Sequence, residues 1–342
     1  YLEQMKQIWI TKAGKPEALE VREADDPTPG PGEVVIDVKA AGVNFADVMA
    51  RLGIYPDAPP LPCVVGYEVT GVVRDCGPDS HRFSAGDRVV ALTRFGGYST
   101  VVCVPENQVY ALPKPLSFAE GAAIPVQYFT AWLALHRFGN LQPDERVLVH
   151  NAGGGVGIAA VQIARHAGAT VIGTASGWKH ERLRELGADE LVDYRKVDWV
   201  DAIREKTDGH GMHVIIDPLG GKNVRKDLEV LAPLGRVVVF GSSSAIHSGR
   251  GSWLSLIRSA LSMPRPGLLK LLGNNWSVAG LNLGHLWSEV ERLRTVGDEV
   301  LAGVQEGWIT PIIAAEVPFD TPAVAHRMLQ ERKNLGKVVL VV

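Results

Sequence analysis

The stretch 147–167 most narrows what this chain can fold into. It opens with a short apolar, β-branched run, passes through a cluster of glycines, and continues with apolar residues at helical spacing. This order predicts a strand, a tight turn and a helix. Ala152-x-Gly154-x-x-Gly157 has the spacing of the dinucleotide fingerprint: a small first residue makes the turn, the second lets backbone N–H groups approach a pyrophosphate, and the third lets helix and strand pack closely. An ordinary strand-to-helix turn is the alternative, but such a turn rarely needs so many glycines together.

Strand-like and helix-like segments alternate from about residue 146 to residue 240, on both sides of this turn. Such alternation predicts a parallel, doubly wound sheet with helices on both faces. The first 110 residues differ, because their short strand-like runs are separated by loops rich in Pro and Gly. The apolar run 336–342 is expected to return to the sheet of that first part. A chain of 342 residues is long enough for two domains with separate cores.

Composition limits the partners and the compartment. The formal net charge of −3 gives no reason to expect nucleic acid or an anionic membrane as a partner. Cys63, Cys76 and Cys103 form no CxxC pair, so we expect reduced thiols in the cytoplasm. No apolar run has transmembrane length and no signal-peptide pattern opens the chain. Met5 looks like a natural start, and residues 1–4 are then expected to be foreign to the native protein.

The residues after the second predicted strand indicate which dinucleotide binds. Proteins that bind NAD usually place Asp or Glu there, about 20 residues past the glycine turn, to hold the ribose hydroxyls. Here the strand ends in Ser176 without an acid, and Lys179 follows. A hydroxyl and an ammonium suit a 2′-phosphate, which a carboxylate would repel, and Arg182 and Tyr194 are placed to join them. We therefore predict NADPH (NADP) over NADH; the alternative for Lys179 is a solvated residue in the first turn of a helix.

Several short motifs point to one family. They are Ala41-Gly-Val-Asn-Phe-Ala-Asp47, Gly53-Ile-Tyr55, Ala85-Gly-Asp-Arg-Val89 and Val149-His-Asn-Ala-Gly-Gly-Gly-Val-Gly157. With them, nearly the whole chain resembles the medium-chain dehydrogenase/reductase superfamily, and within it the zinc-independent quinone oxidoreductases. Later motifs are similar to the branch that contains the vesicle amine transport protein homologues. These are Ile124-Pro-Val-Gln-Tyr-Phe-Thr-Ala131, an insert around 245–275, Asn275-Trp-Ser-Val-Ala-Gly-Leu-Asn-Leu283 and Lys333-Asn-Leu-Gly-Lys337.

The resemblance implies an α/β protein with a GroES-like, mainly β catalytic domain and a Rossmann domain built on a doubly wound parallel sheet. We place the GroES-like substrate domain at 1–127 and 286–342, and the NADPH-binding domain at 128–285. The implied reaction is hydride transfer from NADPH to a quinone or an α,β-unsaturated carbonyl (enone). An enoyl-thioester reductase for a biosynthetic intermediate shares every motif, and a non-catalytic NADPH-binding or membrane-associated protein is the other alternative.

We expect this enzyme to be metal-free. Zinc alcohol dehydrogenases of the same superfamily place Cys and His ligands where this chain has Asn44 and Tyr67. Neither an amide nor a tyrosine phenol is a usual ligand of catalytic zinc. The second, four-cysteine zinc site of those enzymes has no counterpart among the three cysteines.

Four residues are candidates for the reaction. The resemblance places Asn44, Tyr55 and Tyr67 in the cleft near the nicotinamide. Asp47 is the fourth, because it follows Asn44 by three residues and so lies on the same helical face. Asn44 would donate an amide hydrogen bond to the cofactor ribose or to the substrate oxygen, and a phenol of Tyr55 or Tyr67 would polarise that oxygen. The alternatives are a helix N-cap for Asn44, a core tyrosine for Tyr67 and a charge partner of the helix N-terminus for Asp47.

The expected cofactor contacts come from the glycine turn, from the residues that select the nucleotide and from the family pattern. The full set is Asn44, Thr130, Gly153, Gly154, Gly155, Val156, Ser176, Lys179, Tyr194, Leu219, Phe240, Gly241, Ser242 and Asn334.

Two surface features concern partners. Residues 250–272 mix large apolar side chains with Arg250, Arg258 and other cations, which suits either a membrane-interfacial helix or a lid or dimer-flanking insert packed on the cofactor domain. We expect the packed insert. The apolar strand 277–283 resembles the edge strand through which relatives pair their sheets, and we expect a homodimer.

Overall fold

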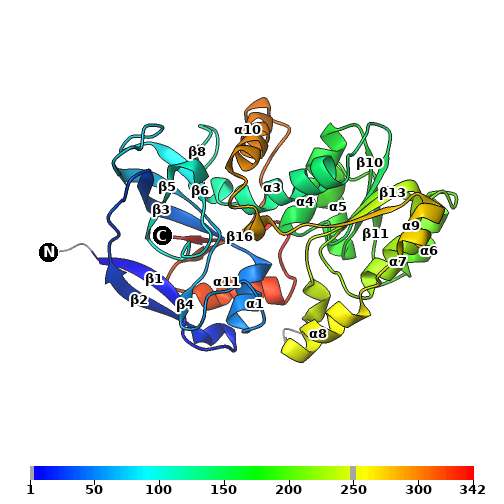
Figure 1. Ribbon diagram of the computed structural model, residues 1–342, viewed down its shortest axis with the longest axis horizontal. Helices are drawn as coiled ribbons and strands as arrows, with labels where there is room; N and C mark the ends of the chain where they lie inside the picture. The colour runs from blue at the N-terminus through cyan, green and yellow to red at the C-terminus, as the bar shows by residue number, and fades with distance from the viewer. Residues whose placement is uncertain (1–3, 247–251) are drawn as a thin grey trace.

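The apolar run before the glycine turn forms a central strand of a six-stranded sheet. The computed structural model describes residues 4–246 and 252–342 and shows two lobes (Figure 1). The six strands run in the order β11-β10-β9-β12-β13-β14, and every neighbouring pair is parallel. This is the doubly wound order of dinucleotide-binding folds. The strands are β9 (Arg146–Val149), β10 (Thr170–Thr174), β11 (Glu190–Val192), β12 (Met212–Asp217), β13 (Leu231–Val239) and β14 (Ser277–Gly280).

Both faces of this sheet are buried, which explains the nearly continuous apolar runs of its strands. In β9, Val147 and Val149 belong to one core cluster and Leu148 to another on the opposite face, because successive side chains of a strand point to opposite sides. Connecting helices cover the faces, as the alternation predicts. They are α4 (Gly155–His166), α5 (His180–Glu185), α6 (Trp199–Lys206) and α7 (Asn223–Glu229), with a 3-10 turn η4 (Gly177–Lys179) before α5.

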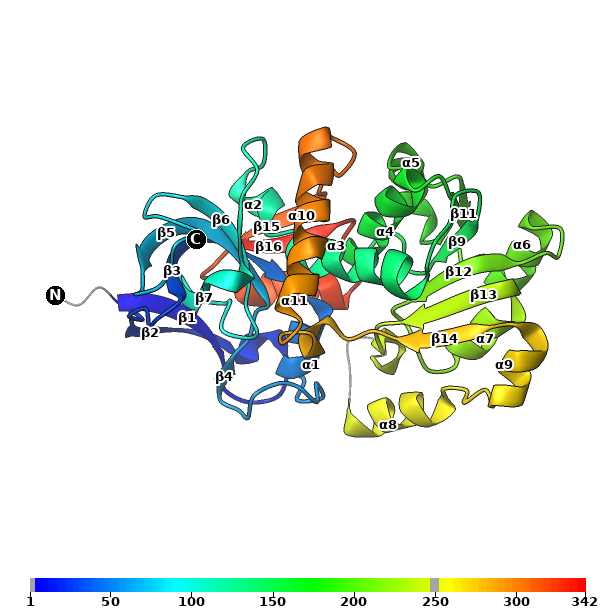
Figure 2. The ribbon, with the colours of Figure 1, turned by 45° about the horizontal axis from the view of Figure 1, so that its top comes forward.

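The insert between β13 and β14 forms two helices, α8 (Trp253–Ser262) and α9 (Leu268–Asn274). Figure 2 shows α9 next to the start of β14, at the edge of the parallel sheet, and α8 farther from this strand. Arg250 of the predicted insert and residues 1–3 of the predicted foreign start lie outside the described residues. None of the described helices is long and apolar enough to cross a membrane.

The second lobe is built mainly from antiparallel strands. Its large sheet runs β15-β16-β3-β5-β6-β8, with β7 paired to β3, and a small sheet runs β2-β1-β4. β1 and β2 pair antiparallel as a hairpin. The strands are β1 (Gln4–Ile10), β2 (Leu19–Asp25), β3 (Glu33–Val43), β4 (Cys63–Val64), β5 (Glu68–Cys76), β6 (Arg88–Leu92), β7 (Val101–Pro105), β8 (Val109–Ala111), β15 (Ile313–Pro318) and β16 (Lys337–Val341).

The end of the chain returns to the sheet of the beginning, as predicted. β16 pairs antiparallel with β3, and β15 pairs parallel with β16. The sequence analysis did not anticipate β8 and β15. β8 has three residues, and β15 lies at the sheet edge with only Val317 buried, so neither shows a clear alternating pattern.

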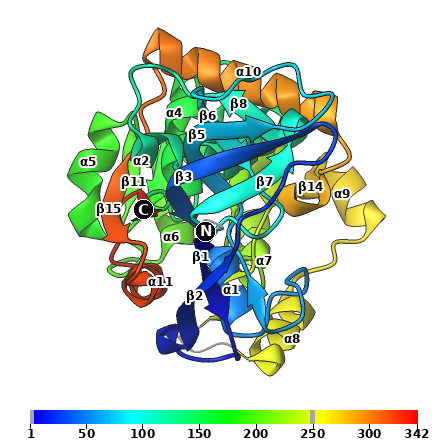
Figure 3. The same cartoon turned by 90° about the vertical axis from the view of Figure 1, so that its left-hand side faces the viewer.

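Helices from both ends of the chain lie where the lobes meet. α3 packs against α4 of the parallel-sheet lobe and against α10, and α1 packs against α11. Seen from the β-rich lobe, α10 and α8 lie on opposite sides of the molecule (Figure 3). The helices are α1 (Phe45–Arg51), α2 (Phe118–Gly121), α3 (Pro125–Trp132) with a π-helical extension η3 (Leu133–Phe138), α10 (Val290–Glu306) and α11 (Pro322–Gln330).

Candidate active site

Asn44 occupies the N-cap position of α1, but its side-chain amide is held from outside that helix. The main-chain N–H of Asn44 donates to Asp47 Oδ2 at 2.8 Å. The amide Nδ2 donates to Glu68 Oε1 at 2.9 Å, and the amide Oδ1 accepts from Lys337 Nζ at 2.7 Å. Asn44 therefore joins the start of α1 to β5 and β16.

Glu68 and Lys337 form a fully buried ion pair, with side chains 0% and 1% exposed. Glu68 Oε2 also accepts from the main-chain N–H of Val126, in the first turn of α3, at 2.7 Å. The sequence analysis quoted Lys337 inside a motif, did not quote Glu68, and gave neither residue a role. The available signal was a charged residue inside an otherwise apolar strand, because such a charge is almost never buried without a partner.

Asp47 lies fully buried beneath Asn44. Its Oδ1 accepts from the N–H of Gly66 at 3.1 Å and its Oδ2 from the Tyr98 hydroxyl at 3.2 Å. Burial raises the pKa of Asp47 to about 7, against the opposing effects of the Asn44 N–H and the Lys337 ammonium. These contacts tie α1 to Gly66 and Tyr98, and the bond from the Asn44 N–H holds Asp47 against the start of α1.

Tyr55 and Tyr67 lie together, as the resemblance implies. Their rings meet edge to face with centroids 6.4 Å apart, and the ring of Tyr67 is tilted against Phe95 at 5.1 Å. The Tyr67 hydroxyl is buried and, apart from the neighbouring Tyr55 hydroxyl, meets no polar partner among the described residues. Burial raises the pKa of both phenols above the ordinary value, so both are neutral O–H donors near pH 7.

Lys179 is buried at the end of β10 and contacts the C-terminal segment. Its exposed fraction is 5%, so the alternative of a solvated lysine is wrong. Its Nζ donates to the main-chain oxygen of Asn334 at 2.6 Å. A Cβ added at Gly153 would lie 2.5 Å from Lys179 Cδ, so the lysine side chain passes directly over the turn. Burial, with the nearby charges of Arg195 and Arg332, lowers the pKa of Lys179 to about 8.

Tyr194 lies in the same positively charged group as Lys179, Arg195 and Arg332. Burial by itself would raise its pKa, but hydrogen bonding with Ser176 and Arg195 and the charge of Arg332 bring it below the ordinary value. Arg182 instead pairs with Glu185 on α5 at 2.6 Å. Sequence reasoning missed Arg332, which follows α11 about 150 positions after Lys179. The resulting group of Ser176, Lys179, Tyr194, Arg195 and Arg332 has the donors and the charge that a 2′-phosphate needs.

The glycine turn is shaped by close contacts on both sides. A Cβ at Gly155 would lie 1.9 Å from the Gln127 amide, and one at Gly157 would lie 2.3 Å from the main-chain oxygen of Asn151. Gly154 precedes α4 without a side-chain cap, which leaves the first N–H groups of α4 for an anion. Val156 lies in this first turn and is only partly buried. These contacts fit a dinucleotide whose pyrophosphate lies against the turn.

The other expected cofactor residues come from two loops and one helix. The loops follow β12 and β13 and touch each other: Phe240 N–H donates to Asp217 O at 3.0 Å, and Ser243 N–H to Pro218 O at 3.1 Å. A Cβ at Gly241 would lie 2.5 Å from Pro218 O. Leu219 and Ser242 therefore lie in adjoining loops at the carboxyl ends of the strands, where such folds bind ligands. Thr130 is buried in α3.

A buried His and two buried carboxyls lie beneath the loop that carries Leu219. His150 Nε2 is 2.8 Å from Asp227 Oδ1, and Asp217 accepts from the N–H of Leu219 at 2.6 Å. Burial lowers the pKa of His150 to about 4, and raises the pKa of Asp217 to about 7 and that of Asp227 to about 8.

The free energy of unfolding is expected to fall as pH rises above 6.5, and Asp227→Asn is expected to make this fall smaller. A carboxyl with a raised pKa keeps in the folded state a proton that the unfolded chain has lost, so the free energy of unfolding falls as pH rises toward the folded pKa. His150 acts in the opposite sense, but only between about pH 4 and 6.5. Each carboxyl contributes up to ~1.4 kcal/mol per pH unit. Urea unfolding at several pH values checks this; the exposed control Asp201→Asn should keep the original slope, and an equal slope for Asp227→Asn would contradict it.

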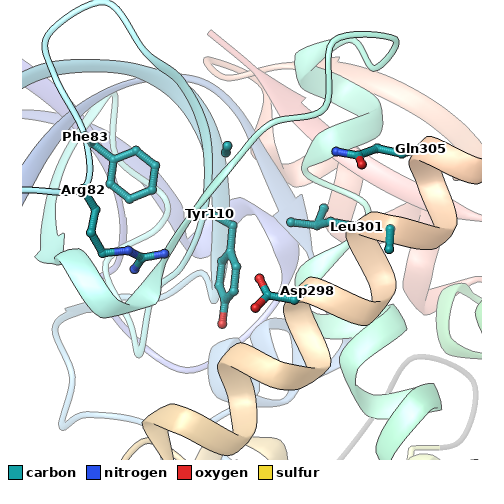
Figure 4. Close-up of a pocket in the computed structure, with 8 residues that line it drawn as sticks. Arg82, Phe83, Tyr110, Asp298, Leu301 and Gln305 are labelled. Atoms are coloured by element: carbon teal, nitrogen blue, oxygen red, sulfur yellow. The ribbon is translucent and has the colours of Figure 1, made fainter.

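A pocket of about 390 Å³ lies at a different place, between the 82–83 loop, β8 and α10. Figure 4 shows Arg82 and Asp298 beside the ring of Tyr110. None of the expected site residues lines this pocket, so it is separate from the cofactor and substrate residues described above.

The residues at the expected zinc-ligand positions do not suit zinc. Asn44 Oδ1 is occupied by the Lys337 ammonium at 2.7 Å, and the raised pKa of Tyr67 keeps its phenol protonated. Within residues 4–246 and 252–342, no group of three or more His, Cys, Asp or Glu side chains is placed to hold a metal ion.

Comparison with known proteins gives the family. The alcohol dehydrogenase GroES-like domain matches residues 30–114, and the zinc-binding dehydrogenase family matches residues 155–291. The human synaptic vesicle membrane protein VAT-1 homolog is 42% identical over 324 residues, covering 94% of this chain and 82% of the relative. Human quinone oxidoreductase is 34% identical over 340 residues, covering 98% of this chain and 97% of the relative.

A solved structure of Escherichia coli quinone oxidoreductase complexed with NADPH is also similar. It superimposes with a TM-score of 0.86 and 29% identity, covering 98% of this chain and 100% of that one. These matches confirm the predicted combination of a GroES-like and a Rossmann-type unit. The chain therefore belongs to the medium-chain dehydrogenase/reductase superfamily, in the group that contains the quinone oxidoreductases and the VAT-1 homologs.

Proposed function

We propose that this oxidoreductase uses NADPH to reduce a quinone or an α,β-unsaturated carbonyl compound, without zinc. The cationic cluster of Lys179, Arg195 and Arg332 at the end of β10 carries the cofactor assignment, because it matches the charge of a 2′-phosphate. The likeness to a quinone oxidoreductase solved with NADPH supports it. We further propose that residues 128–285 bind the cofactor, and that residues 1–127 and 286–342 form the substrate unit.

The substrate class follows from the donors near Asn44. When bound, NADPH supplies a hydride. Addition of hydride to a conjugated carbonyl places negative charge on its oxygen, which preorganised hydrogen-bond donors stabilise. Tyr55 and Tyr67 keep their protons because burial raises the pKa of each phenol, and among the described residues the Tyr67 hydroxyl has no polar neighbour other than the Tyr55 hydroxyl. We assign these phenols and the Asn44 amide to the substrate oxygen and the cofactor ribose.

An enoyl-thioester reductase is the second candidate. A solved structure of CurK enoyl reductase is 30% identical to this chain with a TM-score of 0.84, covering 99% of each chain. The donor set above would serve either substrate class.

Oxidation of NADPH across a substrate panel tests the proposal. The panel contains 1,4-benzoquinone, 9,10-phenanthrenequinone, a simple enone and crotonyl-coenzyme A, each with NADPH and with NADH. Turnover of the quinones or the enone with a strong preference for NADPH is the expected result. Turnover of crotonyl-coenzyme A alone would move the assignment to an enoyl-thioester reductase. Tight NADPH binding without turnover of any panel member would favour a binding role.

We propose a homodimer formed through β14. This strand pairs with β13 on one side, and no described strand pairs with its other edge. An unpaired edge invites a second strand, and exposed apolar side chains lie on β14 and on the preceding helix α9, among them Val278 at 36%, Leu268 at 83% and Leu272 at 75%.

Light scattering is expected to give twice the chain mass of 36.9 kDa, and Val278→Lys is expected to shift the population toward the monomer, because an edge lysine opposes strand pairing. Val324→Lys, which replaces an exposed valine of α11, is the control. A monomeric parent protein would contradict the dimer.

Flotation with anionic liposomes tests the alternative that α8 and α9 bind a membrane. We place the protein in the cytoplasm, which its three free cysteines support.

A further inference from the structure

Lys337 stands at the first position of β16 and reaches three other elements of the fold. Its Nζ donates to Asn44 Oδ1 at 2.7 Å and to Glu68 Oε1 at 2.5 Å. With the Gln127 amide turned so that its oxygen faces the lysine, a third bond of 3.2 Å forms, and the Gln127 nitrogen donates to Ala123 O. All three ammonium hydrogens then have acceptors, as a buried charge requires.

This arrangement allows the Asn44 amide only one orientation. An ammonium has hydrogens to donate and no lone pair, and an ionised carboxylate has only acceptors. Lys337 therefore selects the oxygen of the amide and Glu68 selects its nitrogen. One Nδ2 hydrogen is used by Glu68, and in the part of the chain that the structure describes the other meets no acceptor.

The same cluster extends to the glycine turn. Gln127, the third acceptor of Lys337, lies against Gly155, where a Cβ would be 1.9 Å from its amide. Glu68 in turn holds the first turn of α3 through the N–H of Val126. The lysine thus lies between the element that carries Asn44 and the elements that border the pyrophosphate and nicotinamide parts of the expected cofactor.

We propose that Lys337 is a positioning residue: together with Glu68 it fixes the Asn44 amide so that its remaining N–H is offered to the cofactor ribose or to the substrate oxygen. This inference rests on the proposed function for the identity of the acceptor. It goes beyond that proposal by assigning the orientation of the donor to a buried ion pair between two strands of the β-rich lobe.

A double-mutant cycle separates positioning from simple support of the fold. Lys337→Met with Glu68→Gln removes both charges at similar volume, so that neither is left buried alone. We expect this neutral pair to lower kcat about tenfold and to change the KM for NADPH less than about threefold, because one donor is misdirected while the phosphate contacts persist. Added to Asn44→Ala, which alone should lower kcat by about 100-fold, the neutral pair should cost less than about twofold more.

The comparison has a matched control and a clear contrary result. Lys114→Met replaces an exposed lysine of the same lobe and should leave kcat unchanged. A tenfold loss that persists in the Asn44→Ala background would show that Lys337 acts independently of Asn44, and an unchanged kcat for the neutral pair would show that it does not act at all. Either result would overturn the proposal.

Nuclear magnetic resonance gives a readout that needs no turnover. Protein labelled with 15N at asparagine shows the two side-chain hydrogens of Asn44, identified by their loss in Asn44→Ala. NADP⁺ is expected to shift one of the two in the parent protein, and the shift should vanish in the neutral pair. No NADP⁺-dependent shift in the parent, or the same shift in both proteins, would overturn the inference. Absence of turnover on the substrate panel would refute the proposed function while leaving this test intact.

Discussion

Lys179→Ala is expected to raise the Kd for NADPH by about 10- to 150-fold, because a hydrogen bond between charged groups contributes about 1.5–3 kcal/mol. The Kd for NADH should change little, since NADH lacks the 2′-phosphate. The expectation follows from the burial of Lys179 between Asn334 and the charges of Arg195 and Arg332. Fluorescence titration with both nucleotides measures the two constants. Lys196→Ala, an exposed neighbour, is the control for loss of positive charge; equal weakening of NADPH and NADH binding would refute the assignment.

The same lysine predicts a pH dependence of NADPH binding. Burial and the two arginines lower the pKa of Lys179 to about 8 in the free protein. A phosphate dianion favours the protonated ammonium, so NADPH affinity should be full below about pH 8 and fall by up to about tenfold per unit above it. NADH binding, and NADPH binding to Lys179→Ala, should not show this fall. Titrations between pH 7 and pH 9.5 distinguish the two patterns.

Lys337→Met alone is expected to lower the free energy of unfolding by about 3–5 kcal/mol, because it leaves the Glu68 carboxylate buried without its partner. The neutral pair with Glu68→Gln should recover most of that loss. A surface pair provides the contrast: Lys6 and Asp320 lie 3.3 Å apart with side chains 50% and 64% exposed, and Lys6→Met should cost less than about 1 kcal/mol. Urea unfolding at pH 7 compares the variants, and equal losses for Lys6→Met and Lys337→Met would contradict the burial argument.

The sequence predicted the parallel-sheet lobe well because its signals are local. Each of the strands β9 to β13 is a short apolar run next to a helical pattern, and the glycine turn marks where the first strand ends. β15 was not predictable, because it depends on pairing with β16 and lies at the sheet edge with little burial.

The site residues that belong to a motif could be predicted from the sequence. The contacts between distant segments could not. The motif-based residues Lys179 and Asn334 are 155 positions apart and the structure brings them into contact. Arg332 belongs to no pattern that relates it to the nucleotide, and the bond between Lys337 and Asn44 spans 293 positions. A single sequence shows that Glu68 and Lys337 interrupt apolar runs, but it does not show that they pair with each other.

The segment after α11 has a consequence for protein engineering. Arg332 and Asn334 come from the C-terminal part of the chain, yet they surround Lys179, and the N–H of Gly336 donates to Gly153 O at 3.1 Å. A chimera that transplants only residues 128–285 into a NADH-dependent scaffold would leave this strap behind. Coenzyme preference in such a hybrid would depend on which protein supplied residues 128–285 and which supplied residues 331–337. Exchanging residues 331–337 as well is the shortest graft that carries all the residues of the phosphate cluster.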